Sequence, residues 1–241
     1  MKAKDKMFVA LDVETPEQAL ELVRGLSEYT RMFKIGAKLF TKAGPDLVRE
    51  IVASDAKVFL DLKFHDIPNI VAAAAAEAAR LGVYLFTVHA LGGRQMMLEA
   101  VEATSAAAEK SGCIRPLIVG VTVLTSADAG TLREVGVERS VEDQVASLAL
   151  LCAESGLDGV VASPHEVRLV QSSVARSDFL VVTPGVRPTD DSTDDQRRVM
   201  TPAEAIKAGA NYLVVGRPII GAPDPALAAR RILEQIESAL P

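Results

Sequence analysis

The stretch that decides the fold reads Val58-Phe59-Leu60-Asp61-Leu62-Lys63-Phe64-His65-Asp66. It opens as a buried strand and then carries three charged residues, at positions 61, 63 and 66. Alternate side chains of a strand share a face, so Phe59, Asp61 and Lys63 should point the same way. Charges buried on that face are costly unless they pair or take part in chemistry. This strand end is therefore the best candidate for an active site.

Similar short apolar runs recur along the whole chain. The eight predicted strands span residues 7–11, 32–35, 57–60, 84–88, 117–123, 159–162, 179–182 and 212–215. Eight such strands, each followed by a helix, in about 250 residues indicate a closed (β/α)8 TIM barrel with eight parallel strands. A doubly wound open sheet is the alternative, but it usually has fewer strands and often a Gly-rich first turn. Leu11-Asp12-Val13-Glu14 lacks that turn.

Helix-start patterns separate the predicted strands. Thr15-Pro16-Glu17-Gln18 offers a capping side chain, a proline at the first helical position and a Gln three residues after the cap. The pattern recurs at Ser163-Pro164-His165-Glu166 and Thr201-Pro202-Ala203-Glu204, and residues 71–79 and 94–110 favour helix by composition. Because no linker or low-complexity segment interrupts this alternation, we predict one domain over residues 1–241.

Composition excludes several classes of function. The net charge of −6 argues against a general nucleic-acid or membrane-surface partner. Two cysteines are too few for a disulfide framework, and a thiolate metal site is equally unexpected. The N-terminus lacks a secretory pattern, and no apolar run reaches the roughly 18 residues of a membrane span. We expect a cytoplasmic protein.

Polar residues gather at the predicted strand ends, where such barrels place their chemistry. They are Asp12, Lys34, Asp61 with Lys63, His89, Thr122 or Thr125, Ser163, Arg187 and Arg217. Each also has a structural interpretation: Asp12 as a helix cap, His89 as a core histidine, the charges as a salt-bridge cluster. A structural cluster would not need Lys34 and Asp12 to arrive from other strands.

The seventh and eighth strands are each followed by an arginine. Arg187 and Arg217 stand where these barrels often bind phosphate, and arginine suits bidentate phosphate contacts. The connection at residues 183–200 is unusually long. We interpret it as a segment that closes over a phosphate, with a solvated charged loop as the alternative.

Six segments together resemble the family of orotidine 5′-monophosphate decarboxylases of the bacterial type. They are Leu11-Asp12-Val13, Phe33-Lys34-Ile35-Gly36, Asp61-Leu62-Lys63-Phe64-His65-Asp66-Ile67-Pro68-Asn69, Val121-Thr122-Val123-Leu124-Thr125-Ser126, Thr183-Pro184-Gly185-Val186-Arg187 and Val215-Gly216-Arg217-Pro218-Ile219. Sugar-phosphate decarboxylases of the same suprafamily share much of the D-x-K-x-x-D run, so the specificity lies in the order of all six segments.

The resemblance implies decarboxylation of orotidine 5′-monophosphate to UMP without cofactor or metal. It assigns Lys34, Asp61, Lys63 and Asp66 to a catalytic array, with Lys63 as the proton donor to C6 of the pyrimidine. Asp66 would come from the second subunit of a homodimer. The substrate-binding residues would be Asp12, Lys34, Asp61, Thr125, Arg187, Gln196, Gly216 and Arg217.

One position departs from the family, and two rival functions remain. The family commonly has a threonine where this chain has Ile70. In the family that side chain reaches across the dimer to the ribose region, and Ile70 cannot donate a hydrogen bond there.

One rival is a metal-dependent sugar-phosphate decarboxylase or aldolase, whose relatives typically carry an acidic residue where this chain has Lys34. The other is a non-catalytic phosphate-binding barrel, which would not explain two lysines and three aspartates at one mouth.

Overall fold

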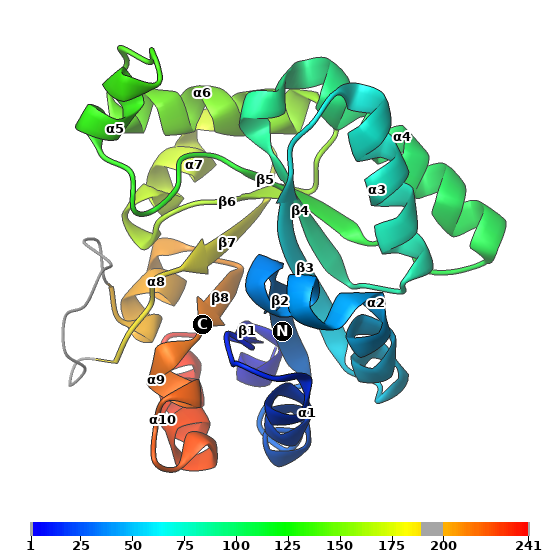
Figure 1. Cartoon of the computed structure of the whole chain (residues 1–241). Coiled ribbons are helices and arrows are strands. Elements are labelled where there is room, and N and C mark those ends of the chain that lie inside the picture. Colours follow the sequence, from blue (N-terminus) through cyan, green and yellow to red (C-terminus); the bar gives the residue numbers. More distant parts are fainter. Residues whose placement is uncertain (1, 189–199, 241) are drawn as a thin grey trace.

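The computed structural model describes residues 2–188 and 200–240. Eight parallel strands form a closed barrel in which neighbours in sequence pair and the last strand pairs with the first. The strands are β1 (Met7–Ala10), β2 (Met32–Gly36), β3 (Lys57–Phe64), β4 (Leu85–His89), β5 (Leu117–Val121), β6 (Gly159–Val161), β7 (Leu180–Pro184) and β8 (Tyr212–Val215). Helices surround this barrel (Figure 1). The predicted (β/α)8 fold is confirmed, and the open-sheet alternative is wrong.

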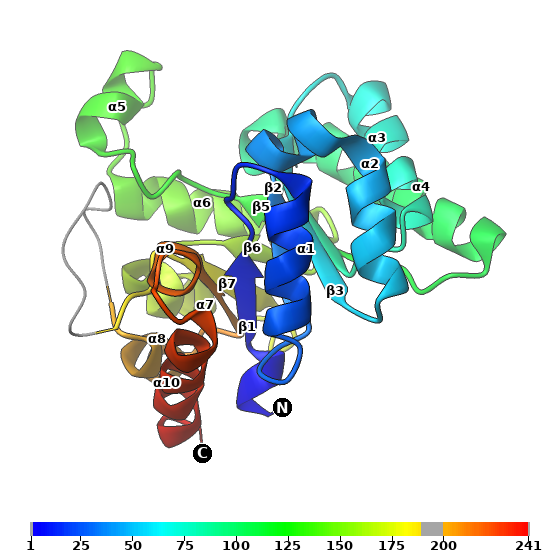
Figure 2. The same ribbon diagram turned by 60° about the horizontal axis from the view of Figure 1, so that its bottom comes forward.

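The described helices follow the strands in sequence. They are α1 (Pro16–Gly25), α2 (Ala37–Ala53), α3 (Pro68–Arg80), α4 (Gly93–Ser111), α5 (Ala129–Glu134), α6 (Val141–Glu154), α7 (Val167–Ser173), α8 (Pro202–Ala208), α9 (Arg217–Ile220) and α10 (Pro225–Ser238), with 3-10 turns η1 (Ala3–Asp5), η2 (Ala90–Gly92) and η3 (Pro164–Glu166). The first and last described elements, η1 and α10, contact each other, whereas α5 stands away from the barrel (Figure 2).

The predicted helix starts are largely confirmed. At α1, Gln18 N–H donates to Thr15 Oγ1 at 3.3 Å, and the Gln18 side chain accepts from Thr15 N–H at 3.2 Å. The corresponding pair at α8 is Thr201 and Glu204. The third pattern differs, because Glu166 accepts from Ser163 N–H but the turn that follows is η3 rather than an α-helix.

Apolar side chains fill the lower half of the barrel. Phe8, Phe59 and Tyr212 point inward, and the Phe8 ring centroid lies 5.4 Å from each of the other two. A second, larger apolar layer lies between the strands and the helices. The filled floor restricts a site inside the barrel to its upper half, at the carboxyl ends of the strands.

The inward-facing positions change from apolar to charged along three adjacent strands. The sequence of inward residues is Phe8, Ala10, Asp12 at β1; Met32, Lys34, Gly36 at β2; and Phe59, Asp61, Lys63 at β3. The period of two that orients the core residues therefore also aims the charges into the mouth.

Strand β3 leaves the regular ladder where the charges begin. Leu60 pairs with Phe86 and Phe64 pairs with Val88, so β3 carries two extra residues between these pairs. Within the irregularity, Lys63 has a left-handed backbone with φ of 51°. This conformation costs a residue other than glycine about 1–3 kcal/mol, so the surrounding contacts must hold it.

Candidate active site

A cavity of about 560 Å³ opens at the carboxyl ends of the strands. Its lining includes eight of the residues predicted from the sequence: Asp12, Lys34, Asp61, Lys63, Thr125, Arg187, Gly216 and Arg217. Asp66 does not line it, and Gln196 lies outside the described residues. The fold therefore brings residues from six strand ends, or the loops that follow them, into one space.

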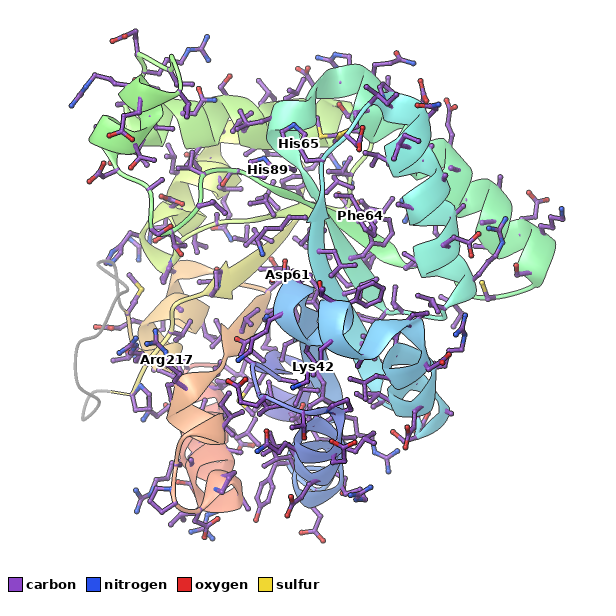
Figure 3. The ribbon with its side chains drawn as sticks, viewed as in Figure 1. Lys42, Asp61, Phe64, His65, His89 and Arg217 are labelled. Atoms are coloured by element: carbon purple, nitrogen blue, oxygen red, sulfur yellow. The ribbon has the colours of Figure 1, made fainter. Side chains whose placement is uncertain are left out.

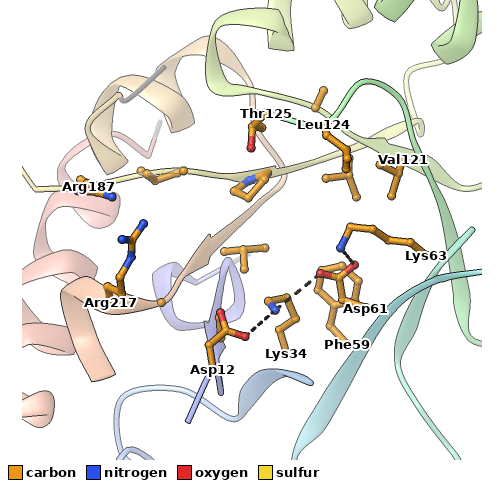
Figure 4. A pocket seen from close by; sticks show the side chains of 18 of the residues that line it. Asp12, Lys34, Phe59, Asp61, Lys63, Val121, Leu124, Thr125, Arg187 and Arg217 are labelled. Atoms are coloured by element: carbon orange, nitrogen blue, oxygen red, sulfur yellow. Dashed lines mark hydrogen bonds and ion pairs between the residues drawn. The ribbon is translucent and has the colours of Figure 1, made fainter. Parts of the chain in front are cut away.

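Four charged side chains alternate in sign along one wall of the cavity. Lys63 Nζ lies 2.8 Å from Asp61 Oδ1, and Lys34 Nζ lies 3.7 Å from Asp61 Oδ2 and 3.2 Å from Asp12 Oδ1 (Figure 4). The order along the wall is thus Lys63, Asp61, Lys34, Asp12. Each charge has an opposite neighbour, which offsets part of the cost of removing it from water.

Burial differs along this charged row. The side chains of Lys34 and Asp61 are only 11% and 14% exposed, whereas those of Lys63 and Asp12 are 39% and 53% exposed. The two central charges, Lys34 and Asp61, are therefore largely removed from solvent and pair with each other. The Lys63 ammonium at the open end is accessible to a bound molecule.

Gly36 gives the Lys34 ammonium its space. A Cβ at this position would lie 3.2 Å from Lys34 Nζ and 3.5 Å from Asp12 Oδ1. The absence of a side chain at the end of β2 therefore lets the ammonium sit between the two carboxylates.

Two arginines lie across the cavity from Lys63 and Asp61 (Figure 4). Arg187 is buried and its backbone N–H donates to Met200 O at 3.1 Å, which joins the two ends of the long connection after β7. Arg217 is exposed and begins α9 (Figure 3). Their guanidinium groups suit an anionic group such as phosphate.

The remaining candidates lie outside the cavity lining. Thr122 donates its hydroxyl to Val161 O at 3.0 Å, and Thr125 rather than Thr122 reaches the cavity. Ser163 is buried and does not line the cavity. The His89 ring stacks on His65 with centroids 5.3 Å apart, and Nδ1 accepts from Leu91 N–H at 3.4 Å. Burial, followed by the nearby charges of His65 and Lys63, lowers the pKa of His89.

Asp66 is exposed and follows Lys63, a residue of the cavity lining, by three positions. Its Oδ1 accepts from the backbone N–H of Ile67 at 2.7 Å. Three apolar side chains nearby are exposed: Ile67 at 61% and Ile70 at 49% follow Asp66 in the chain, and Leu91 at 49% belongs to η2, whose Gly92 lies against His65. We name Ile67, Ile70 and Leu91 the rim patch, which α3 and the turn after β4 present to the surroundings.

Residues suited to a metal are not grouped in the described ranges. No cluster of three or more His, Cys, Asp or Glu side chains there could hold a metal ion. Within residues 2–188 and 200–240, no helix has both the length and the apolar character needed to cross a membrane.

The sequence and the fold have clear relatives. The family model described as "Orotidine 5'-phosphate decarboxylase / HUMPS family" matches residues 5–232. The orotidine 5'-phosphate decarboxylase of Syntrophotalea carbinolica is 55% identical over 240 residues, covering 100% of this chain and 98% of that protein. The enzyme of the same name from Moorella thermoacetica is 54% identical, covering 98% and 94%.

A solved structure gives the same result for the fold. The crystal structure of orotidine 5'-phosphate decarboxylase from Lactobacillus acidophilus superposes with a TM-score of 0.85 at 38% identity, covering 96% of this chain and 99% of that one.

Proposed function

Because this chain belongs to the orotidine 5'-phosphate decarboxylase / HUMPS family and decarboxylates orotidine 5′-monophosphate to UMP in pyrimidine biosynthesis, we propose that Lys63 is its proton donor. The observation that carries this assignment is the 2.8 Å pairing of Lys63 Nζ with Asp61 in a cavity whose far side holds two arginines. A nucleotide with a carboxylate at one end and a phosphate at the other matches that arrangement.

The proposed step breaks one bond and forms one. The bond between C6 and the carboxylate breaks, CO2 departs, and the electron pair stays on C6 in the plane of the ring. No π-system delocalises this pair, so a nearby cation must stabilise it. The Lys63 ammonium does so and donates a proton to C6, which yields UMP, and the resulting amine regains a proton from solvent.

Asp61 contributes in two ways in this proposal. A substrate carboxylate about 4 Å from Asp61 would be repelled by roughly 4 kcal/mol at an effective dielectric constant of about 20. Enzymatic accelerations correspond to about 8–23 kcal/mol, so repulsion supplies only a part. The greater part comes from stabilising the carbanion, and Asp61 helps by keeping Lys63 charged and oriented.

The other predicted site residues would bind the parts of the substrate that are remote from the reacting carbon. We assign the ribose hydroxyls to Asp12 and Lys34, and the neighbourhood of the base to Thr125. The phosphate would bind Arg187, Gln196, Gly216 and Arg217. Binding energy from the remote phosphate can then be used to order the reacting groups.

We further propose a homodimer in which Asp66 completes the partner's site. Two observations support it: Asp66 does not line its own chain's cavity, and the rim patch of three exposed apolar side chains lies beside it. Exposed apolar clusters commonly mark interfaces. In that assembly Ile70 would make an apolar contact where the family's threonine donates a hydrogen bond. Because the reaction belongs to pyrimidine biosynthesis, we propose that the protein is cytoplasmic.

A metal-dependent reaction is not favoured by the donor set. Lys34 Nζ lies between Asp12 and Asp61, at 3.2 Å and 3.7 Å, so an ammonium already occupies the position between the carboxylates. A divalent cation there would meet like charge. We therefore expect UMP formation from orotidine 5′-monophosphate to be unaffected by EDTA, and inactivation by the chelator would favour the metal-dependent rival.

The role of Lys63 can be tested by substitution. We expect Lys63→Ala to lower kcat by on the order of 10⁴-fold, since it removes both the charge and the proton. Lys63→Arg keeps the charge but donates a proton poorly, so it should also be strongly impaired. Lys57→Ala is the matched control, because Lys57 begins the same strand and packs over the Tyr84 ring. A Lys63→Ala protein with wild-type kcat would overturn the assignment.

The shared site can be tested by mixing two inactive variants. Asp66→Asn and Lys63→Ala homodimers would each lack one element of both sites. Random exchange makes about half of the dimers hybrid, each with one intact site, so activity should recover to about a quarter of wild type. If Asp66 serves its own chain, no hybrid contains an intact site and no recovery follows.

A further inference from the structure

One residue of β4 faces the whole charged irregularity of β3. Leu60 pairs with Phe86 and Phe64 with Val88, which leaves Thr87 alone opposite residues 61–63. Backbone N–H groups in this part of β3 therefore lack the regular ladder partner of a parallel strand. A buried N–H without a partner is costly, so a substitute acceptor is needed.

Thr87 supplies that acceptor and also a donor. The Lys63 backbone N–H donates to Thr87 Oγ1 at 2.8 Å, and Thr87 Oγ1 donates to Asp61 Oδ1 at 3.2 Å. The same Asp61 Oδ1 also accepts a hydrogen bond from Lys63 Nζ at 2.8 Å. The single hydroxyl proton of Thr87 thus goes to the carboxylate, and a lone pair goes to the backbone.

We propose that Thr87 is a positioning residue that sets the geometry of Asp61 and Lys63 for decarboxylation. It is fully buried and does not line the cavity, so it acts through these two residues rather than on the substrate. The inference rests on the roles proposed above for Asp61 and Lys63.

The strained backbone of Lys63 explains why such a residue is needed. A left-handed φ of 51° persists only where contacts fix it, and the Thr87 bond is made by the N–H of that same residue. The second bond orients the Asp61 carboxylate toward the Lys63 ammonium. Without the hydroxyl, both the lysine stem and its carboxylate partner lose a restraint, while the arginine end of the cavity is untouched.

The sequence alone does not single out Thr87. It lies in the middle of the run Leu85-Phe86-Thr87-Val88, and threonine is common in strands. Its only distinctive signal is its place two residues before His89 on the inward face, opposite a motif whose irregular backbone is not visible in the sequence.

The experiment compares Thr87→Val, which keeps the shape and removes the hydroxyl, with Thr87→Ser, which keeps the hydroxyl. We expect kcat to fall by about 10–100-fold in Thr87→Val and by less than about threefold in Thr87→Ser, because bonds to charged groups are the strong ones. The Kd of UMP should change less than about threefold in both, because its phosphate binds across the cavity. Thr104→Val is the matched control, since Thr104 is a buried threonine of α4 whose hydroxyl donates to the backbone oxygen of Ala100, within its own helix.

Several outcomes separate this inference from the proposed function. A Thr87→Val protein with wild-type kcat would overturn the positioning role of Thr87. Equal losses of kcat in Thr87→Ser and Thr87→Val would also overturn it. So would a loss of kcat accompanied by an equal weakening of UMP binding. If Thr87→Val does not fold, Thr87→Ala against Thr87→Ser makes the same comparison of hydroxyl and no hydroxyl. If Lys63→Ala retains wild-type kcat, the proposed function fails first.

Discussion

Gly36 matters at the scale of single atoms, because the Lys34 ammonium occupies the place of its missing side chain. An added Cβ would lie 3.2 Å from Lys34 Nζ, closer than a comfortable contact. We therefore expect Gly36→Ala to displace the ammonium by a few tenths of an ångström and to lower kcat/KM by roughly tenfold, given the sensitivity of reactions to placement.

The matched control for this substitution is Gly25→Ala. A Cβ at Gly25, the last residue of α1, meets nothing within 4 Å, so its kinetics should equal those of wild type. Steady-state assays of UMP formation make the comparison. Equal kcat/KM in Gly36→Ala and Gly25→Ala would contradict the close fit around Lys34.

His89 provides a pH dependence of stability. Its pKa is lowered from 6.5 by burial, then by the charges of His65 and Lys63. The unfolded chain therefore takes up this proton first, so stability is lost as pH falls below about 6.5. Glu14 and Glu204, whose pKa values lie below 4.5 because of hydrogen bonds to Lys38 and Thr201, stay ionised in this range.

We expect His89→Gln to reduce the loss of stability on acidification. The decrease in Tm from about pH 7.5 to about pH 5.5 should be smaller in this variant than in wild type. His165→Gln, at an exposed position, serves as the control and should lose as much as wild type. Identical pH profiles for wild type and His89→Gln would show that the proton is taken up elsewhere.

At the scale of elements, the start of α1 is fixed by a reciprocal pair of hydrogen bonds between Thr15 and Gln18. Thr15→Ala removes the acceptor for Gln18 N–H, so we expect the free energy of unfolding to fall by about 1 kcal/mol. Urea titrations of the wild type and the variant, fitted with a common m-value, measure this difference in the free energy of unfolding. Ser172→Ala, which removes an exposed hydroxyl that donates to Leu169 O, should change it by less than about 0.5 kcal/mol.

Strand β3 is the element whose observed extent differs most from the expectation. The apolar run predicts residues 57–60, whereas the strand continues to Phe64. The charges of Asp61 and Lys63 hide this continuation, because the apolar criterion ends where the inward face becomes a site. Their alternation with Leu62 and Phe64, which pack against the outer core, is what keeps the segment extended.

At the scale of the whole molecule, the rim patch is the surface that a homodimer would bury. We expect Leu91→Asp to weaken dimerisation by on the order of 100-fold, because a carboxylate would lose water without gaining a partner. Sedimentation at several concentrations measures the dissociation. Ile114→Asp is the control, since Ile114 is 91% exposed but lies by the amino ends of the strands, among the residues around Tyr84. A wild-type protein that sediments as a monomer would refute the dimer.

The closure of the barrel also bears on domain organisation. Met7 pairs with Leu213, so the first and last strands complete one another. We propose on this ground that residues 1–241 form a single domain, since removing either end would expose the edge of a neighbouring strand.

The amino-acid sequence by itself determined the strand count, the barrel and the charged end of β3, because these follow from local periodicity and residue type. It also singled out Lys34, Asp61, Lys63, Arg187 and Arg217. Side-chain alternation is a property of any extended segment, so it needs no knowledge of long-range contacts.

Only the tertiary structure decided how those residues meet. The two extra residues of β3, the left-handed Lys63 and the hydroxyl of Thr87 arise from the register between two strands, which local sequence does not encode. The same holds for Lys34 between Asp12 and Asp61, and for Asp66 on the outer edge. Register and closure depend on pairings between residues far apart in the chain, and these set distances that composition and periodicity leave open.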